Sequence, residues 1–473
     1  MRAAFAATLL VLAPTSAWAE ALSLDEAVRR GVDHNVGLAV QQLETALAED
    51  RRRQAWSAYE PRLDAGISRS NDLVNYLDPD EPVSGIPLRI GVRQALPGGG
   101  SIGFSYAGTI YDQEARDLGY DPTPDLIVSL TQPLLSGAIF GARERSVAEA
   151  RFGVEQAHLG LEAAVADLVL AVENAYWSLV QAGDSVAAAE QSLEGARRQQ
   201  AWVEERIQLG FDAPSELLAT QERIASAEAE LTGAVAARED AEAQLLYLLG
   251  VDLGDPDRPT IEPTSVPGTG ETTPPDAALE AATRRSIPLR LARRSLEQAR
   301  RDLRYTVVDQ LPSIDGNVGV RRDLGQEETL TVWSVGLSLS MPIPGVGRIT
   351  GIRSAQRRVR QAELLLEDAT QQMRLEVERA LRDVAATRAG FRLAEQGLDL
   401  AQRKYDAEVE RLNRGTSTNR EVLEYLEDRD ASARAWNRSR TAVARSEGRL
   451  RRIIGAGLSD WGVQLDRLIE AAR

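Results

Sequence analysis

Few residues in this 473-residue chain have the types and spacing that catalysis or metal binding requires. The sequence contains no cysteine, so disulfides, thiol catalysis and cysteine-ligated metals are excluded. The two histidines, His34 and His158, fall in different predicted helices and form no zinc-binding motif. No nucleophile–base pair and no closely spaced pair of catalytic carboxylates emerges either. We therefore predict that the protein is not an enzyme and uses no cofactor or metal.

Acidic residues follow two glycine-containing turns at a regular spacing. Glu216 lies six residues after Gly210, whereas Glu421 and Glu424 lie six and nine residues after Gly415. Both turns separate long apolar-periodic segments, so the glutamates fall in the first turns of predicted helices. A carboxylate at that position is stabilised by the helix macrodipole, which is one explanation for all three.

The segments on either side of these turns predict coiled coils. Between Leu161 and Ile207 the apolar residues alternate steps of four and three, and only Gln200 interrupts them. The same register returns 205 residues later, from Leu366 to Leu412, with more polar residues in it. A sustained 3.5-residue repeat indicates helices that supercoil around one another.

The chain is internally duplicated. Asp25–Leu38 matches Asp276–Leu289 at an offset of 251 residues, and Gly250 matches Gly455 at an offset of 205. Each half reads as a helix, strands, a long helix and a shorter helix. The predicted helices run over 23–59, 143–209, 214–249, 276–309, 348–413 and 420–454.

The N-terminus predicts a secretory signal. Met1-Arg2 is positively charged, Ala3–Ala13 is apolar, and Ala17-Trp18-Ala19 has the spacing that signal peptidase recognises. No later uncharged apolar run of about 18 residues predicts a transmembrane helix. We expect a periplasmic, secreted or β-barrel outer-membrane protein, without a lipidated N-terminal cysteine. The predicted parts are a signal peptide (1–19), a first repeat (20–250, strands in 61–134), a linker (251–275), a second repeat (276–455, strands in 312–341) and a C-terminal tail (456–473).

Short alternating runs between the helices predict strands. They lie within 63–68, 86–93, 102–110, 126–131, 314–320 and 332–340. Such runs are typical of an outer-membrane barrel, although a half-buried soluble sheet alternates in the same way. Six strands cannot close a channel-sized barrel, so a barrel would need several copies of the chain. The net charge of −16 argues against a nucleic-acid partner.

Four short motifs, in this order and spacing, carry a family resemblance. They are Leu24-Asp-Glu-Ala-Val28, Tyr59-Glu-Pro61, Thr131-Gln-Pro-Leu-Leu135 and Ser340-Met-Pro-Ile343. With the duplication, they make the chain similar to TolC-type outer membrane efflux proteins from Ala21 to about Gly455.

The resemblance implies an α+β membrane protein. Three protomers would share one transmembrane β-barrel in outer-membrane lipid, continued into the periplasm by an α-barrel of antiparallel coiled-coil helices. A periplasmic adaptor and an inner-membrane transporter would dock at the helical end. The implied function is a passive conduit of a tripartite efflux or type I secretion system, and the exported substrate is not encoded in the chain.

The resemblance also assigns roles to the turns. It implies a periplasmic gate at Glu216, Glu421 and Glu424, where threefold symmetry would make carboxylate rings that favour cations. Some relatives have a gate arginine where this chain has Ser417, so Arg414 or Arg420 would have to replace it. The implied adaptor-binding tips, which otherwise only form the turns, are Gly210, Phe211, Asp212, Ala213, Pro214, Ser215, Gly415, Thr416, Ser417 and Thr418.

The first half carries an extra strand pair, at about 86–112, beyond the two strands per repeat usual in relatives. The pair could enlarge a trimeric barrel from 12 to 18 strands, or it could fold outside the membrane. Its up-and-down order, with the Pro97–Gly100 turn on the periplasmic side, favours the barrel.

A different function class, a periplasmic coiled-coil adaptor without a pore, is the main alternative. Such adaptors have a single helical hairpin flanked by compact β-domains. Two copies of the helix–strands–helix–helix order argue against this alternative.

Overall fold

The structure, a computed structural model, describes residues 19–73, 83–111, 124–135, 141–210, 213–256, 258–264, 274–324, 330–341, 346–457 and 461–471. The predicted signal peptide, except Ala19, lies outside these residues. The chain forms two compact units. The helical unit contains Met1–Leu43, Gly160–Arg290 and Ala369–Ala472, and the sheet unit contains Glu44–Leu159, Leu291–Asp368 and Arg473.

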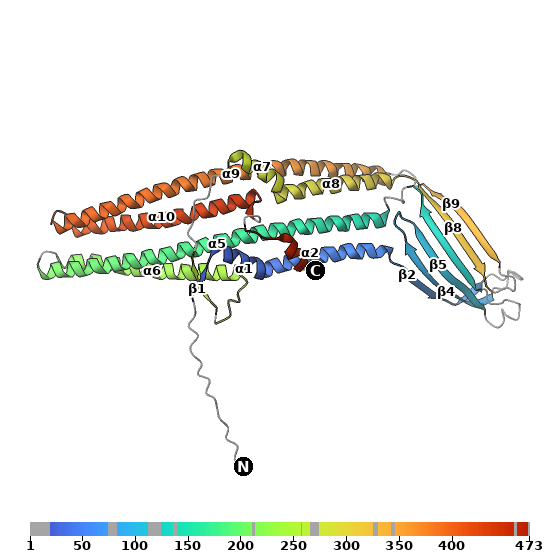
Figure 1. The fold of residues 1–473 in the computed structure, drawn as a ribbon, viewed down its shortest axis with the longest axis horizontal. Helices are drawn as coiled ribbons and strands as arrows, with labels where there is room; N and C mark the ends of the chain where they lie inside the picture. The colour runs from blue at the N-terminus through green and yellow to red at the C-terminus, as the bar shows by residue number, and fades with distance from the viewer. Residues whose placement is uncertain are drawn as a thin grey trace, which may run out of the picture. The chain divides into compact units, whose positions relative to one another are not determined.

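Helices make up most of the described chain, and Figure 1 shows them as coiled ribbons. They are α1 (Leu24–His34), α2 (Val36–Trp56), η1 (Ser57–Tyr59), α5 (Ala142–Gln208), α6 (Ser215–Leu248), α7 (Pro275–Arg285), α8 (Ile287–Val308), α9 (Val346–Asn413), α10 (Asn419–Ile453) and α12 (Leu465–Ala471). The strands are β1 (Ala19–Leu22), β2 (Arg62–Ile67), β3 (Ser70–Leu73), β4 (Val83–Ala95), β5 (Ser101–Tyr111), β6 (Asp125–Pro133), β7 (Thr260–Pro263), β8 (Ser313–Asp323) and β9 (Thr331–Ser340).

The two long helices confirm the coiled-coil prediction. α5 has 67 residues and α9 has 68, so each extends roughly 100 Å at 1.5 Å per residue. Every predicted stripe position from Leu161 to Ile207, and from Leu366 to Leu412, is buried or half-buried. Among the described helices, α5 alone is long and apolar enough to cross a membrane by length and composition. Its residues Leu161 and Val165 lie in the hydrophobic core, and core packing accounts for such a composition.

The helices predicted over 23–59 and 276–309 are each interrupted once. At Asn35 the backbone turns out of the helix (φ −67°, ψ 122°), and its side chain accepts the Leu38 N–H at 3.0 Å and donates to the Leu248 carbonyl at 3.0 Å. Ser286 has nearly the same backbone conformation (φ −55°, ψ 119°). Asparagine and serine favour such cap positions because their side chains satisfy free backbone N–H groups.

Two glycines let the shorter helices end against these interruptions. Gly250 has φ +76° and Gly455 has φ +69°, a conformation that L side chains rarely adopt. A Cβ on Gly250 would lie 2.2 Å from the His34 carbonyl oxygen, and one on Gly455 would lie 2.6 Å from Arg285 Cβ. The C-terminal ends of α6 and α10 therefore pack directly on the α1–α2 and α7–α8 junctions.

A hydrophobic core in the helical unit gathers segments that are distant in the sequence. β1 pairs in parallel with β7, which buries Leu22 and Ile261. The Tyr176 hydroxyl of α5 donates to the Leu22 carbonyl at 2.9 Å. Trp461 and Leu468, from the segment predicted as a C-terminal tail, pack against the same core.

Ion pairs join α10 to the α5–α6 hairpin. Arg223 of α6 contacts Asp430 of α10 at 3.0 Å, with side chains only 12% and 9% exposed. Arg429 also contacts Asp430, at 2.7 Å. Farther along α10, Arg434 pairs with Glu230 of α6 at 2.8 Å.

In the sheet unit the strands form one antiparallel sheet in the order β2-β4-β5-β6-β8-β9, and β3 pairs with β4 beyond the end of β2. The sheet runs along the right of Figure 1, with β8 and β9 in yellow and orange. β4 and β5 contain the predicted extra pair, and they lie inside the sheet between β2 and β6.

The buried ion pair generates a stability prediction. Replacing Asp430 with Asn should destabilise the fold by about 3 kcal/mol, because Arg223 would stay buried without its counter-charge. Asp428→Asn, at an exposed position in the same helix, is the matched control and should change little. Thermal unfolding of the detergent-solubilised protein, followed by circular dichroism, measures both. Equal melting temperatures for the two variants would contradict the assigned contact.

Candidate functional site

The turn between α9 and α10 is built by a glycine and a helix cap. Gly415 ends α9 with φ +74°. Thr418 then caps α10: its hydroxyl accepts the Glu421 N–H at 3.3 Å, and the Glu421 carboxylate accepts the Thr418 N–H at 2.9 Å. This reciprocal capping box satisfies two backbone groups that a helix start leaves free.

The carboxylate of Glu421 is already occupied by its own turn. Besides the Thr418 N–H, it accepts the Ser417 hydroxyl at 2.9 Å and the Thr418 hydroxyl at 3.0 Å. The backbone hydrogen bond, followed by these hydroxyls, lowers the pKa of Glu421, so it keeps its negative charge in more acidic solution than an ordinary glutamate. The structure therefore gives Glu421 the role of starting α10, whatever else it contacts.

Ser417, predicted to stand where some relatives have a gate arginine, links two acidic residues. Its hydroxyl donates to Glu421 and to Glu408, a buried residue of α9 that also receives Arg411 at 3.1 Å. Arg414 pairs with Glu410 in its own helix at 3.3 Å. Arg420 is exposed and forms no ion pair among the described residues, so of the two predicted substitutes only Arg420 is uncommitted.

The turn between α5 and α6 contacts the turn between α9 and α10 through one asparagine. Asn419 is buried; its amide donates to Glu216 at 3.5 Å, and its carbonyl oxygen accepts Gln199 of α5. Glu216 is therefore half-buried and tied to α10. Gly210 ends α5 with φ +78°, whereas the predicted tip residues Phe211 and Asp212 lie outside the described residues.

The three predicted gate residues thus have different environments. Glu421 caps a helix and Glu216 contacts the neighbouring turn. Glu424 is exposed and makes no hydrogen bond or ion pair to the part of the chain that is described. Of the three, Glu424 has the carboxylate most available to a passing ion.

Sequence reasoning missed Asn419 and Gln199, which link the two turns, and it missed the contact of Glu408 with Ser417 inside the second turn. Polar residues in a predicted helix are expected to face solvent. The duplication does not point to Asn419 either, because the matching residue in the first repeat, 205 positions earlier, is Pro214. For this turn, the readable signal in the sequence is the three-residue spacing from Thr418 to Glu421, which predicts a capping box at the start of the helix.

The sheet has two chemically distinct faces, and its register shows this most clearly in one row. Leu63, Val92, Phe104, Val128, Val320 and Trp333 are consecutive cross-strand partners from β2 to β9. Their exposed fractions run from 39% at Val128, at the centre, to 75% at Trp333, so none of the described residues covers this apolar face. The adjacent row, on the other face, consists of Arg62, Arg93, Gly103, Ser129, Gly319 and Ser334.

Both edges of the sheet are open within the described chain. β2 and β9 each have one sheet neighbour, β4 and β8 respectively. Each edge strand therefore presents a row of backbone N–H and carbonyl groups that a further strand would satisfy.

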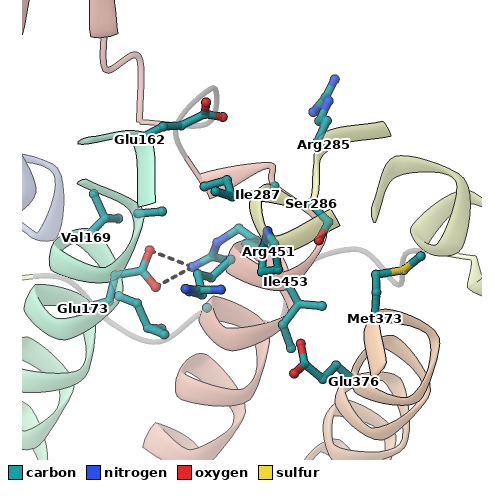
Figure 2. A pocket seen from close by; sticks show the side chains of 17 residues that line it. Glu162, Val169, Glu173, Arg285, Ser286, Ile287, Met373, Glu376, Arg451 and Ile453 are labelled. Carbon is teal, nitrogen blue, oxygen red and sulfur yellow. Dashed lines mark hydrogen bonds and ion pairs between the residues drawn. The ribbon is translucent and has the colours of Figure 1, made fainter. Parts of the chain in front are cut away.

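A cavity of about 40 Å³ in the helical unit is a structural feature rather than a ligand site. Figure 2 shows Glu173 of α5 facing Arg451 of α10, which donates to both carboxylate oxygens at 3.1 Å. Trp461 donates to Glu173 at 2.8 Å, and a Cβ on Gly448 would lie 2.2 Å from the same carboxylate. No predicted gate or tip residue lines this cavity. Among the described residues, no group of three or more acidic or histidine side chains could hold a metal.

Solved structures of other proteins share this architecture. A membrane protein from Pseudomonas aeruginosa superposes with a TM-score of 0.72 at 18% identity, covering 91% of this chain and 90% of that one. The Campylobacter jejuni CmeC outer membrane channel gives a TM-score of 0.69 at 16% identity, covering 95% and 89%. These similarities show a shared fold of long helices and a β-domain.

Sequence comparison adds the family. Protein CyaE of Bordetella pertussis is 26% identical over 293 residues, so the match spans about 60% of that relative and 60% of this chain. The profile described as outer membrane efflux protein matches residues 100–251 and 278–456, which is more than half of the chain. The predicted family and function class, an outer-membrane export channel, are thereby confirmed, and the chain belongs to the outer membrane efflux protein family.

Proposed function

We propose that three copies of this chain share one β-barrel in the outer membrane and extend it into the periplasm as a helical tunnel, which forms a passive export conduit. The observation that carries the proposal is the sheet, which is apolar and uncovered on one face and open at both edges. In hydrocarbon each unpaired backbone group costs several kcal/mol, so only a closed barrel is stable there.

The strand directions allow the barrel to close. All neighbouring strands are antiparallel, and the path from β2 to β9 contains an even number of strands. β9 therefore runs opposite to β2, and β9 of one copy can continue the antiparallel pattern with β2 of the next. A single copy cannot enclose a channel, because even eight strands leave an interior filled by side chains.

The paired helices support the tunnel. α5 and α9 have nearly equal lengths, as do α6 (34 residues) and α10 (35 residues). The same Gly-on-junction contact occurs at Gly250 with His34 and at Gly455 with Arg285. These correspondences support two tandem repeats, each supplying one helical hairpin to the tunnel wall.

The sheet also weighs against the alternative of a pore-less periplasmic adaptor. Leu337, Leu339 and Trp333 are 75%, 69% and 75% exposed. In an adaptor surrounded by water, these apolar side chains would face solvent, which is energetically unfavourable. In this proposal, the adaptor and the inner-membrane transporter are separate partners. They contact the turn residues around Gly210 and Gly415, which are chemically suited to helix-tip docking.

The gate belongs to the same proposal. Glu424 would supply the carboxylate ring that selects cations, Glu421 would hold the turn in shape, and Glu216 would couple the two turns through Asn419.

Stoichiometry tests the shared barrel. Native mass spectrometry of the detergent-solubilised protein should give three copies, and the same sample should conduct ions in planar bilayers. The physical reason is that no described strand pairs with the open edges of β2 and β9, so strands of other copies would satisfy them. A folded monomer without conductance would refute the barrel and favour the adaptor.

Charge removal at the turn tests the gate. Glu424→Gln should lower the cation-over-anion permeability ratio by roughly threefold, read from the reversal potential in a KCl gradient, because a charge lining a narrow aqueous constriction acts on nearby ions. Glu421→Ala should lower the melting temperature, since it removes the side chain that forms half of the capping box, whereas Glu421→Gln keeps an acceptor there. Glu239→Gln, an exposed acid near the other end of α6, is the charge-matched control. If it changes selectivity as much as Glu424→Gln, Glu424 is not part of the gate.

A further inference from the structure

We propose that β4 and β5 are membrane-spanning strands, so that each copy contributes six strands and the trimer closes a barrel of 18 strands with a wide aqueous lumen. This inference rests on the proposed shared barrel and adds its size and the kind of solute it can pass.

The position of the pair in the sheet is the first argument. β4 pairs with β2 from Arg62↔Arg93 to Ile67↔Leu88, and β5 pairs with β6 from Ser101↔Thr131 to Ala107↔Asp125. The pair therefore separates β2 from the rest of the sheet instead of extending an edge. β4 has 13 residues and β5 has 11, enough to span a membrane as tilted strands of about 9–11 residues.

The apolar face is the second argument. Ile90 and Val92 of β4, and Ile102 and Phe104 of β5, are 42–50% exposed. Through β6, the row of Phe104 continues to Val320 and Trp333, and the row of Ile102 continues to Val318 and Val335. If the pair lay outside the membrane, this continuous surface would be half in lipid and half in water. The matching occupant for the whole face is the acyl chains of the outer-membrane lipid.

The turn of the pair is anchored where the neighbouring helices meet the sheet. The Gly99 N–H and the Tyr59 hydroxyl both donate to one oxygen of Glu144, at 3.1 and 3.0 Å, and Gln132 donates to the Gly98 carbonyl at 2.9 Å. Tyr59 ends η1, which directly follows α2, and Glu144 lies in the first turn of α5, so the turn is fixed at the helical end of the sheet. Both strands then run the full height of the wall.

The other face is suited to a water-filled lumen. A Cβ on Gly103 would lie 2.9 Å from the Ser129 hydroxyl, and one on Gly319 would lie 2.8 Å from the Ser334 hydroxyl. From β5 to β9 the lumen-side row thus consists of glycine and serine, which do not fill the interior, and Arg62 and Arg93 complete it on β2 and β4. Barrel diameter grows roughly linearly with strand number, so 18 strands give a barrel about 1.5 times as wide as 12, in the range of aqueous porins. The lumen would admit bulky solutes that a 12-strand barrel excludes.

Because the chain has no cysteine, single cysteines can test the wall directly. We expect Phe104→Cys to behave like Leu337→Cys, reacting poorly with a water-soluble maleimide and, once labelled with a fluorophore, being quenched by brominated lipids. Ser105→Cys should behave like Ser338→Cys, reacting with the water-soluble reagent. If Phe104→Cys reacts in water while Leu337→Cys does not, the pair lies outside the membrane and the inference fails. If Leu337→Cys and Ser338→Cys do not differ, the shared barrel itself fails.

Polymer exclusion measures the width in the same reconstituted trimer. With polymer added only on the barrel side, away from the narrow turn end, the largest polyethylene glycol that still lowers single-channel conductance should be clearly larger than for CmeC, measured in the same way. An equal cut-off would overturn the wide lumen, even if the trimer conducts.

A cluster of arginines carries a second, independent inference. Arg62 and Arg93 are direct cross-strand partners, and Arg143 lines the same cavity of about 230 Å³. Like charges directly opposite each other destabilise a sheet. None of the three forms an ion pair with a described residue, although Glu60 and Asp64 also line the cavity. By contrast, Arg321, on the same face, pairs with Asp125.

We infer that Arg62, Arg93 and Arg143 bind an oxyanion, a carboxylate or phosphate group, carried by a solute in the lumen. Guanidinium groups match such anions by paired hydrogen bonds, and three of them outnumber the two carboxylates nearby. The cluster lies on the face opposite to the apolar row, so a soluble anion can reach it more readily than a lipid headgroup can.

Calorimetric titration of the full trimer with pyrophosphate tests the site. Arg93→Gln should weaken binding about tenfold, because it removes a charged hydrogen-bond donor. Arg322→Gln, an arginine in register with the apolar face, is the matched control and should bind as the unaltered protein does. No pyrophosphate binding, or equal affinity in both variants, would overturn the site. Loss of co-purifying phospholipid from Arg93→Gln without a change in pyrophosphate affinity would also overturn it, in favour of a headgroup site. Conductance, measured in parallel, shows whether the channel itself is intact.

Discussion

Backbone hydrogen bonding in a lipid environment is the constraint on which this architecture depends. The apolar row from Leu63 to Trp333 suits hydrocarbon, but the same surroundings make the unpaired edges of β2 and β9 unfavourable. In the proposed barrel, assembly of several copies resolves that conflict, and the even strand number makes closure geometrically simple. Under that proposal the sheet is stable only as part of the trimer, and its exposed hydrophobic surface is the part that contacts lipid.

The helices meet the opposite requirement, because they must remain associated in water. α5 is buried largely by its own chain, with Leu161, Val172 and Val203 almost inaccessible. α9 has the same register but keeps Leu393 and Leu400 exposed, as a helix that packs against another copy in the proposed trimer would. Arginine–carboxylate pairs such as Arg223–Asp430 then fix which helices are neighbours, since a mismatched pairing would leave a charge buried.

Much of the helical part was predictable because its signals are local. Heptad spacing, turn glycines and the Thr418–Glu421 cap can be read within a few residues, and the structure contains all of them. The interruptions at Asn35 and Ser286 were missed because they depend partly on the distant ends of α6 and α10. The location of β4 between β2 and β6, and the meeting of Arg62 with Arg93, depend on strand register, which alternation alone does not define.

The parallel pairing of β1 with β7 has a consequence for how the protein is made. The register joins Leu22 to Pro263, partners separated by more than half the chain length. A polypeptide that crosses the inner membrane from its N-terminus exposes β1 long before β7 emerges. Until then the core around Leu22 and Tyr176 cannot form. Its formation also requires two distant segments to come together, which has a cost in chain entropy. In a chain exported from its N-terminus, as the predicted secretory signal implies, β1 is therefore among the last strands to become ordered.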